Sequence, residues 1–160
     1  MTKPYKRPES VLVVVYTPEL QSLIIERTDY KDAWQNVTGS LEDDETPRQT
    51  AIRELQEELG IDASQHELQD WGITNEWEIF EIWRHRYAPG VTMNTEHVFG
   101  LLVSERFEPQ LAPREHTGWL WRDWNVAAEA VFSPSNADAL RMLPEMAEKF
   151  GASMLPQGHA

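Results

Sequence analysis

Cysteine is absent from the 160 residues of the chain. This absence excludes a disulfide framework, a zinc site with cysteine ligands and a catalytic thiol. Positive charge is also scarce, because Lys and Arg number 14 against 27 Asp and Glu, which gives a formal net charge of −13. Such a chain should repel nucleic-acid backbones and anionic membranes, so we expect neither as a partner. An anionic substrate would need a local reversal of this field, and a bound divalent cation can supply it.

Long hydrophobic runs are missing as well. The longest covers residues 11–16, whereas a helix that spans a membrane needs about 20 residues. Basic residues precede this run, but it is too short for a signal peptide and charges resume at Glu19. We therefore expect a cytoplasmic location, and no obligate protein partner is evident. Hydrophobic residues make up 41% of the chain, which suffices for a single domain over residues 1–150 followed by a frayed tail over 151–160.

Local patterns predict an α+β fold in which strands precede and follow a helix. The β-branched run 11–16 is typical of a buried strand, and 23–27 is its expected partner. Further strands are expected at 68–75, 78–87, 96–103 and 119–121, with a short extended piece at 34–38 and a loop at 40–46. Ser133 and Pro134 predict the start of a second helix, which Pro144 should break or restart.

The segment 47–59 has the clearest helix signals. Thr46 and Gln49 can form a capping box, Pro47 suits the first helical position, and Gly60 suits the end. On a helical wheel Ile52, Leu55 and Leu59 form the expected core face, and three glutamates occupy an adjacent arc, namely Glu54, Glu57 and Glu58. Taken alone, these glutamates fit either a solvated helix face or a site for a hard divalent cation.

A longer signature surrounds this helix. Gly39, Glu45 and the run Arg53-Glu54-Leu55-Gln56-Glu57-Glu58-Leu59-Gly60-Ile61 stand at the spacing of the box, residues 39–61, that marks Nudix hydrolases. The chain resembles this family at every specified position. The resemblance implies a mixed β-sheet sandwiched between α-helices and hydrolysis of a nucleoside diphosphate linked to another group. It also implies Mg²⁺ as cofactor, with Mn²⁺ as a possible substitute.

The same resemblance assigns roles to the box residues. Glu54 and Glu58 would be the principal metal ligands, and Glu57 would be a further ligand or would orient the attacking water. Arg53 would orient a box carboxylate, and Glu45 would be a structural partner in the loop. These roles suit pyrophosphate cleavage, which needs an activated water and charge neutralisation on the phosphates but no covalent nucleophile.

Segments outside the box narrow the substrate. The stretch Arg84-His85-Arg86-Tyr87-Ala88-Pro89-Gly90-Val91, together with 5–8 and 34–40, resembles the branch of the family that hydrolyses dihydroneopterin triphosphate to the monophosphate and pyrophosphate in folate biosynthesis. The similarity runs from about residue 5 to about residue 136. It implies a fourth metal ligand that also contacts substrate, Glu115. It further implies a set of substrate-binding residues: Lys6, Arg27, Thr38, Trp77, Glu78, Ile79, Phe80 and Ser133.

The chemistry of these residues supports such roles but leaves alternatives. Trp77 and Phe80 offer aromatic surface to a flat ring, yet residues three apart on a strand face opposite sides, so one of the two is expected in the core. Glu78 is expected as a buried acceptor for the 2-amino-4-oxo edge of a pterin. Lys6 and Arg27 supply positive charge for a triphosphate, or are simply solvated. Ser133 offers donors to phosphate, or only caps a helix.

Two histidines and two other functions stay open. His85 and His116 could act as acid or base, but structural or surface roles are expected for both. A nucleotide-pool enzyme that cleaves dATP or 8-oxo-dGTP is the alternative reaction, since guanine shares a hydrogen-bonding edge with pterin. A Nudix module that binds a nucleotide without cleaving it is the third possibility, and the presence of Glu54, Glu57 and Glu58 argues against it.

Overall fold

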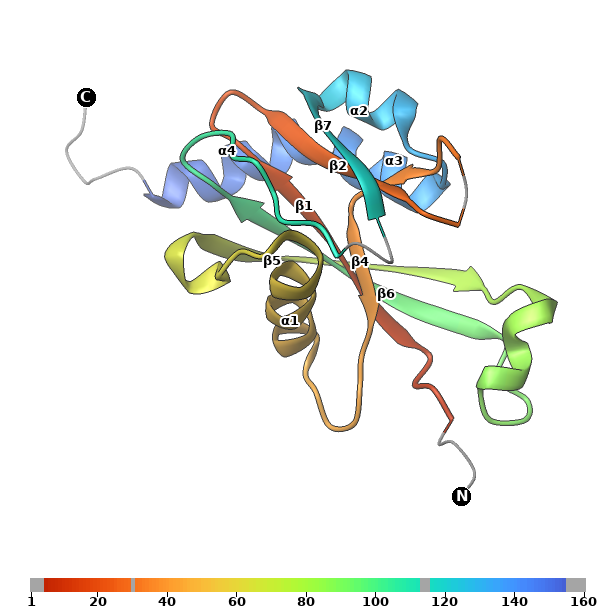
Figure 1. Ribbon diagram of the computed structural model, residues 1–160. Coiled ribbons are helices and arrows are strands. Elements are labelled where there is room, and N and C mark those ends of the chain that lie inside the picture. Colours follow the sequence, from red (N-terminus) through yellow and green to blue (C-terminus); the bar gives the residue numbers. More distant parts are fainter. Residues whose placement is uncertain (1–4, 30, 113–115, 155–160) are drawn as a thin grey trace.

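The computed structural model describes residues 5–29, 31–112 and 116–154, and these form one mixed sheet between helices (Figure 1). The sheet has seven strands. They are β1 (Glu9–Tyr16), β2 (Gln21–Arg27), β3 (Trp34–Gln35), β4 (Val37–Ser40), β5 (Glu67–Glu78), β6 (Met93–Leu102) and β7 (His116–Asp123). The helices are α1 (Pro47–Leu59), η1 (Ala63–Gln65), η2 (Glu81–Arg86), α2 (Trp124–Ala130), α3 (Pro134–Arg141) and α4 (Leu143–Met154). None of the helices in this described part is both long and apolar enough to cross a membrane.

Strand β1 is the centre of the sheet and is buried on both faces. Val11, Val13 and Val15 point to one face and pack in a core with Leu55 of α1, and we call this face the α1 side. The residues between them point to the other face and pack against α2, α3 and α4, and we call it the α3 side. A continuous β-branched run is the pattern expected for a strand covered on both faces. The predicted α+β sandwich is therefore confirmed.

The sheet divides at β1. Strand β2 pairs with the end of β1 at Val15 and Tyr16, whereas β4 pairs with the same edge from Ser10 to Val13. Strand β3 pairs with β2, and β7 pairs with the other edge of β2. The piece predicted at 34–38 is thus two strands that belong to different parts of the sheet and are separated by a single residue, Asn36. In Figure 1, β4 runs beside β1 and lies below β2 and β7 in the view shown.

Helix α1 confirms the expected ends and corrects the expected core face. Both hydrogen bonds of the capping box between Thr46 and Gln49 are present, and Gly60 ends the helix in a left-handed conformation with φ 69°. Ile52, however, is 42% exposed. Glu58 is buried instead, at 3% exposure, beside Leu55 and Leu59. The helix is rotated relative to the prediction, because a carboxylate takes a core-side position that the wheel gave to an apolar residue.

Several other boundaries differ from the prediction. The strand expected over 78–87 is wrong, since β5 ends at Glu78 and a 3₁₀ helix, η2, follows. Helix α2 was not expected, and it begins directly after β7 without a side-chain cap. The tail expected over 151–160 is helical as far as Met154, and the rest lies outside the described residues. The helix start at Ser133 and Pro134 is confirmed, and a new helix begins next to Pro144, at Leu143.

Candidate active site

Two carboxylates of α1 are held in the protein interior. The side chains of Glu54 and Glu58 are 12% and 4% exposed, whereas that of Glu57 is 55% exposed. Residues four apart lie one above the other on a helix, so Glu54 and Glu58 share one face. Glu54 rests against the backbone of β4, because a Cβ atom added to Gly39 would lie 2.2 Å from its Cδ atom. A side chain at position 39 would therefore displace the Glu54 carboxyl.

The side chain of Arg53 donates hydrogen bonds to three carboxylates. Its Nε and Nη2 donate to the two oxygens of Glu45 at 2.8 and 2.9 Å, and its Nη1 donates to Glu54 at 2.7 Å and to Glu57 at 3.2 Å. Nη2 also donates to the carbonyl of Ser40 at 3.0 Å, which links α1 to β4. The Arg53 guanidinium lowers the pKa of Glu45 to about 2. The expected pairing of Arg53 with box carboxylates, and the expected structural contact of Glu45, are both present.

Charge is crowded around Glu54. Burial raises its pKa to about 7, and the nearby Glu57 adds to this rise, while Arg53 opposes it. The side chain of Glu58 interacts with the Glu54 carboxyl and also lowers its pKa. Without a cation, one proton can relieve the repulsion between the two buried carboxyls.

The Glu54–Glu58 pair fits a hard divalent cation, which favours oxygen ligands and would replace that proton. Within the described residues no group of three or more His, Asp or Glu is arranged to hold a metal ion. The predicted fourth ligand, Glu115, lies outside the described residues. A cation such as Mg²⁺ suits two protein carboxylates, because it commonly completes its coordination with waters and substrate phosphates.

His116 contacts Glu58 directly, a neighbour that spacing along the sequence did not indicate. Nε2 of His116 lies 3.3 Å from Oε1 of Glu58 and 3.4 Å from the amide nitrogen of Gln35. His116 and Gln35 are buried, at 5% and 6% exposure. Burial lowers the pKa of His116 to about 4, and the positive charge of Arg27 contributes. The imidazole is therefore neutral near pH 7, and its place beside Glu58 comes from the pairing of β7 with β2.

The cationic and hydroxyl candidates lie in several places. Lys6 is exposed, and its backbone N–H donates to Arg86. Arg27 donates two hydrogen bonds to Asp29, at 2.8 and 2.6 Å, and its guanidinium also lies over the ring of Phe132. Asp29 therefore neutralises much of the charge that Arg27 would offer to a phosphate.

Thr38 and Ser133 lie at β4 and at the start of α3. Thr38 is half-buried and pairs with Leu12, which places it on the α3 side of the sheet. Ser133 caps α3, because its Oγ accepts hydrogen bonds from the backbone and side-chain nitrogens of Asn136 at 3.3 and 2.6 Å. The capping role considered for Ser133 is thus confirmed.

The four candidates at 77–80 do not form one surface. Trp77 is half-buried, Ile79 is 1% exposed and Phe80 is 66% exposed, where it packs edge-on against Trp83. The expectation that Trp77 or Phe80 enters the core is wrong, since Ile79 takes that place. Glu78 is not the buried acceptor that was expected, because its side chain is 72% exposed and pairs with Arg84.

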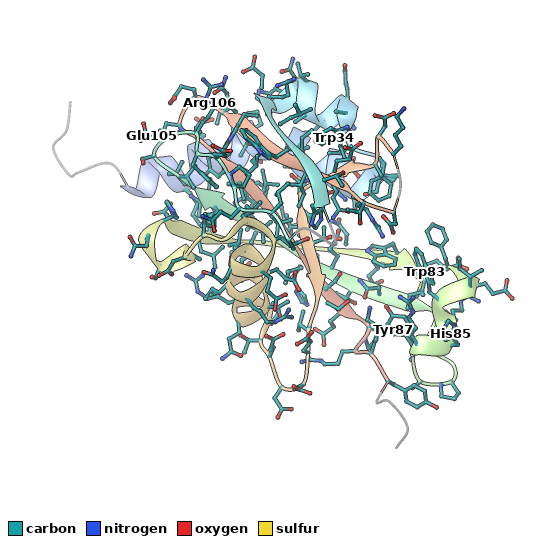
Figure 2. All side chains as sticks on the ribbon, in the orientation of Figure 1. Trp34, Trp83, His85, Tyr87, Glu105 and Arg106 are labelled. Carbon is teal, nitrogen blue, oxygen red and sulfur yellow. The ribbon has the colours of Figure 1, made fainter. Side chains whose placement is uncertain are left out.

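The distinctive stretch 84–91 forms the end of the β5–β6 arm. Figure 2 labels Trp83, His85 and Tyr87 at this end, away from α1. Arg84 donates to the carbonyl of Ile79 as well as to Glu78, and the guanidinium of Arg86 lies over the Trp83 ring. Tyr87 is buried and His85 is exposed, a position that suits a surface role for His85. These contacts stabilise the turn of the arm.

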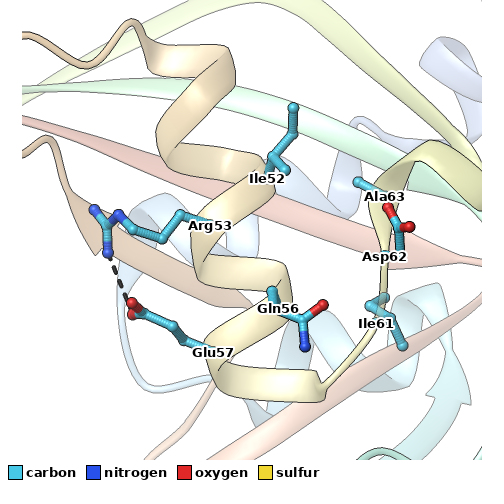
Figure 3. Close-up of a pocket in the computed structure, with 7 residues that line it drawn as sticks. All are labelled: Ile52, Arg53, Gln56, Glu57, Ile61, Asp62 and Ala63. Atoms are coloured by element: carbon cyan, nitrogen blue, oxygen red, sulfur yellow. Dashed lines mark hydrogen bonds and ion pairs between the residues drawn. The ribbon is translucent and has the colours of Figure 1, made fainter.

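A hollow of about 380 Å³ lies beside α1 (Figure 3). The exposed Ile52, with Gln56 and Ala63, forms part of its wall, and the ion pair of Arg53 with Glu57 borders it. Glu54 and Glu58 are not among the residues that line it. The hollow therefore flanks the carboxylate pair and does not contain it.

The fold and the carboxylate helix define a Nudix hydrolase, and the chain belongs to this family, because the model of the NUDIX domain matches residues 6–146. The chain is similar to the dihydroneopterin triphosphate diphosphatase of Escherichia coli (strain K12), with 47% identity over 141 residues, which cover 86% of this chain and 93% of that protein. The enzyme with the same name from Haemophilus influenzae is 43% identical over 140 residues, with 86% and 87% covered. The solved structure of the E. coli dihydroneopterin triphosphate pyrophosphohydrolase matches with a TM-score of 0.78 at 45% identity and covers 88% of this chain and 97% of that one.

Proposed function

We propose that this protein hydrolyses dihydroneopterin triphosphate to dihydroneopterin monophosphate and pyrophosphate, with Mg²⁺ as cofactor, as a cytoplasmic step of folate biosynthesis. The observation that carries the proposal is the buried Glu54–Glu58 pair, held by Gly39 and Arg53 in a chain that resembles enzymes of this name over most of its length. The members of this family generally use a divalent metal, and Mn²⁺ is a plausible substitute for Mg²⁺.

The residues of the site have separate roles in metal binding, positioning and proton transfer. Glu54 and Glu58 would hold the cation, which supplies charge neutralisation on the phosphates and acidifies a bound water. Arg53 keeps Glu54 in place through its Nη1 and anchors itself on Glu45. Glu57 is the most exposed of the three glutamates and can accept a proton from the attacking water. The water oxygen forms a new bond to phosphorus, the phosphoanhydride bond breaks, and pyrophosphate leaves.

A substrate panel tests the proposal. Dihydroneopterin triphosphate, dGTP, dATP and 8-oxo-dGTP are compared with Mg²⁺, and inorganic phosphate is measured with and without added pyrophosphatase. We expect a signal only when pyrophosphatase is present, and the highest kcat/KM for dihydroneopterin triphosphate. The matched control is Glu58→Gln, which keeps the shape of the side chain and removes a ligand charge.

Two results would overturn the proposal in different directions. A higher kcat/KM for dATP or 8-oxo-dGTP would assign the protein to nucleotide-pool cleaning. Binding of a triphosphate without release of any phosphate, in the presence of Mg²⁺, would make it a nucleotide sensor.

A further inference from the structure

A second buried carboxylate, Glu96, lies outside the Nudix box. It belongs to β6 and is 4% exposed. In the sheet it pairs with Ser10 of β1 and with Asn75 of β5, and Ser10 pairs in turn with Ser40 of β4. Four polar residues therefore form one row across four strands, and residues in register point to the same face. Because Ser10 alternates with Val11 on β1, this row faces the α3 side.

The surroundings of Glu96 do not satisfy its charge. The side chains of Ser135, Asn75 and Trp77 approach its carboxyl and lower its pKa, but burial outweighs them and the net pKa is raised. Oε1 accepts no hydrogen bond from any residue in the described part of the chain. The side chain of the nearby Asn94 donates a hydrogen bond to Ser10 Oγ at 2.8 Å. These two polar neighbours of Glu96 therefore hydrogen bond with each other.

A buried acid usually serves the fold through an ion pair or a full set of hydrogen bonds. Glu96 forms no ion pair with a Lys, Arg or His of the described residues. An apolar residue or a glutamine would fill the same space at a lower cost in free energy. The position of the carboxylate is explained if a ligand supplies the missing donors.

The ligand chemistry follows from the geometry. A carboxylate accepts two parallel hydrogen bonds from two adjacent N–H groups. The 2-amino-4-oxo ring of a pterin or a guanine presents such a pair, its 2-amino group and the neighbouring ring N–H. Trp77 and Asn75 are half-buried, lie on the same face of β5 and approach the carboxyl, so Trp77 can offer an aromatic surface to a flat ring beside it.

The row of Glu96 extends across the sheet to β4, the strand against which the carboxylate pair of α1 packs. Glu96, Ser10 and Ser40 lie on three neighbouring strands, and two strand spacings amount to about 10 Å. Ser40 follows Gly39, against which Glu54 rests. Glu54 rests on the α1 side of β4 and Glu96 lies on the α3 side, so a ligand that binds both must pass the edge of β4 that pairs with no other described strand. The extended triphosphate and open-chain linker of the substrate suit such a path.

From this geometry we propose that Glu96 is the specificity-determining residue of the site and binds the amino and ring N–H groups of a 2-amino-4-oxo-pyrimidine ring. This inference rests on the proposed function and deepens it. It also replaces Glu78 as the ring acceptor. Glu78 follows Trp77 on β5, so its side chain points to the opposite face of the sheet, away from Glu96.

The test compares Glu96→Gln with a matched control, Glu76→Gln, an exposed glutamate of β5 that points to the opposite face from Trp77. Each protein is assayed with dihydroneopterin triphosphate, dGTP and dATP, and its thermal midpoint is measured. In Glu96→Gln, an amide N–H₂ faces the donors of the ring. We expect kcat/KM to fall by about 30-fold or more for dihydroneopterin triphosphate and dGTP. For dATP, whose edge lacks the 2-amino donor, we expect a change of no more than about threefold.

Glu96→Gln should keep or raise the thermal midpoint, because it removes a buried charge, and Glu76→Gln should leave all rates and the midpoint unchanged. An equal change in kcat/KM for all three substrates would refute the role of Glu96. If Glu96→Gln does not fold, Glu96→Asp retains the charge, withdraws it from the ring, and should lower the pterin-to-dATP ratio by about tenfold.

The proposed function can fail separately from this inference. If the wild type cleaves purine triphosphates better than dihydroneopterin triphosphate, the proposed function is wrong, and the ratio of dGTP to dATP still measures the role of Glu96. If the wild type prefers dihydroneopterin triphosphate and Glu96→Gln retains that preference, only the inference about Glu96 is wrong.

Discussion

The Nε2 atom of His116 lies 3.3 Å from Oε1 of Glu58, and both side chains are only 4% exposed. His116 belongs to β7 and Glu58 to α1, so this contact joins the helix on the α1 side to the part of the sheet formed by β2 and β7. The low pKa of His116, about 4, keeps the imidazole neutral near pH 7. A neutral imidazole beside Glu58 leaves uncancelled the negative charge that a bound metal cation would require.

Acid should weaken the folded state through His116. Its folded pKa of about 4 lies below the ordinary value of 6.5, so the unfolded chain takes up the proton first. The contribution to stability is present above about pH 6.5 and is lost as the pH falls toward 4. We expect the free energy of unfolding of the wild type to drop by about 1–2 kcal/mol more than that of His116→Gln between pH 7 and pH 5. Urea unfolding in chelator, with the exposed His85→Gln as control, measures this, and parallel pH profiles would contradict it.

The substitution Glu58→Gln should separate activity from stability. It retains the shape of a buried side chain but removes a ligand charge and the repulsion with Glu54, whose pKa is raised to about 7. We expect kcat to fall by a few orders of magnitude, about 10²–10⁴, while the thermal midpoint holds or rises slightly. Steady-state kinetics and thermal unfolding check this, and wild-type turnover by the variant would remove Glu58 from the mechanism.

Removal of metal should abolish turnover. Without a cation, ionisation of both buried carboxyls, Glu54 and Glu58, is unfavourable because their charges repel each other. The chain as a whole also carries a formal net charge of −13. We expect no hydrolysis in excess EDTA, recovery on addition of Mg²⁺, and partial or full recovery with Mn²⁺. Undiminished activity in excess chelator would show that the metal mechanism is wrong.

Gly39→Ala should damage the site more than the fold. The new Cβ would lie 2.2 Å from Cδ of Glu54, and the Glu54 carboxyl can swing away from it. We expect kcat to fall by about 100-fold or more, with a loss of stability of only about 1–2 kcal/mol. The matched control is Gly151→Ala, since a Cβ there meets no atom within 4 Å and an alanine suits a helix. A fully active Gly39→Ala would show that activity does not depend on the packing of Glu54 against the backbone of Gly39.

The sequence predicted those features that depend on neighbours along the chain. The buried strand β1, the capping box of Thr46 and Gln49 and the end of α1 at Gly60 are all local, and all are present. The core face of α1 was less predictable, because Ile52 is the apolar residue and yet Glu58 occupies the buried position. Periodicity favours apolar residues inside, so it cannot identify a carboxylate that is buried for its chemistry.

Contacts between distant segments escaped prediction. His116 meets Glu58 only because β7 pairs with β2, and Glu96 meets Asn75 only through the register of β6 with β5. Helix α2 was missed because it starts directly after β7 without a side-chain cap. In the segment 77–80, strand alternation was expected to place Trp77 or Phe80 in the core, but β5 ends at Glu78, and the turn into η2 buries Ile79 and exposes Phe80.

The two neighbouring residues Thr38 and Gly39 point to opposite faces of β4, and this strand therefore separates two groups of the site. Gly39 seats Glu54 on the α1 side, while Thr38 faces the α3 side, where Glu96 lies. If Glu54 holds the phosphates through a cation and Glu96 binds the ring, as proposed, this one short strand sets the separation between the two groups. A ligand that is too short can reach one group but not both, so the enzyme would select its substrate by length as well as by the pattern of donors on the ring.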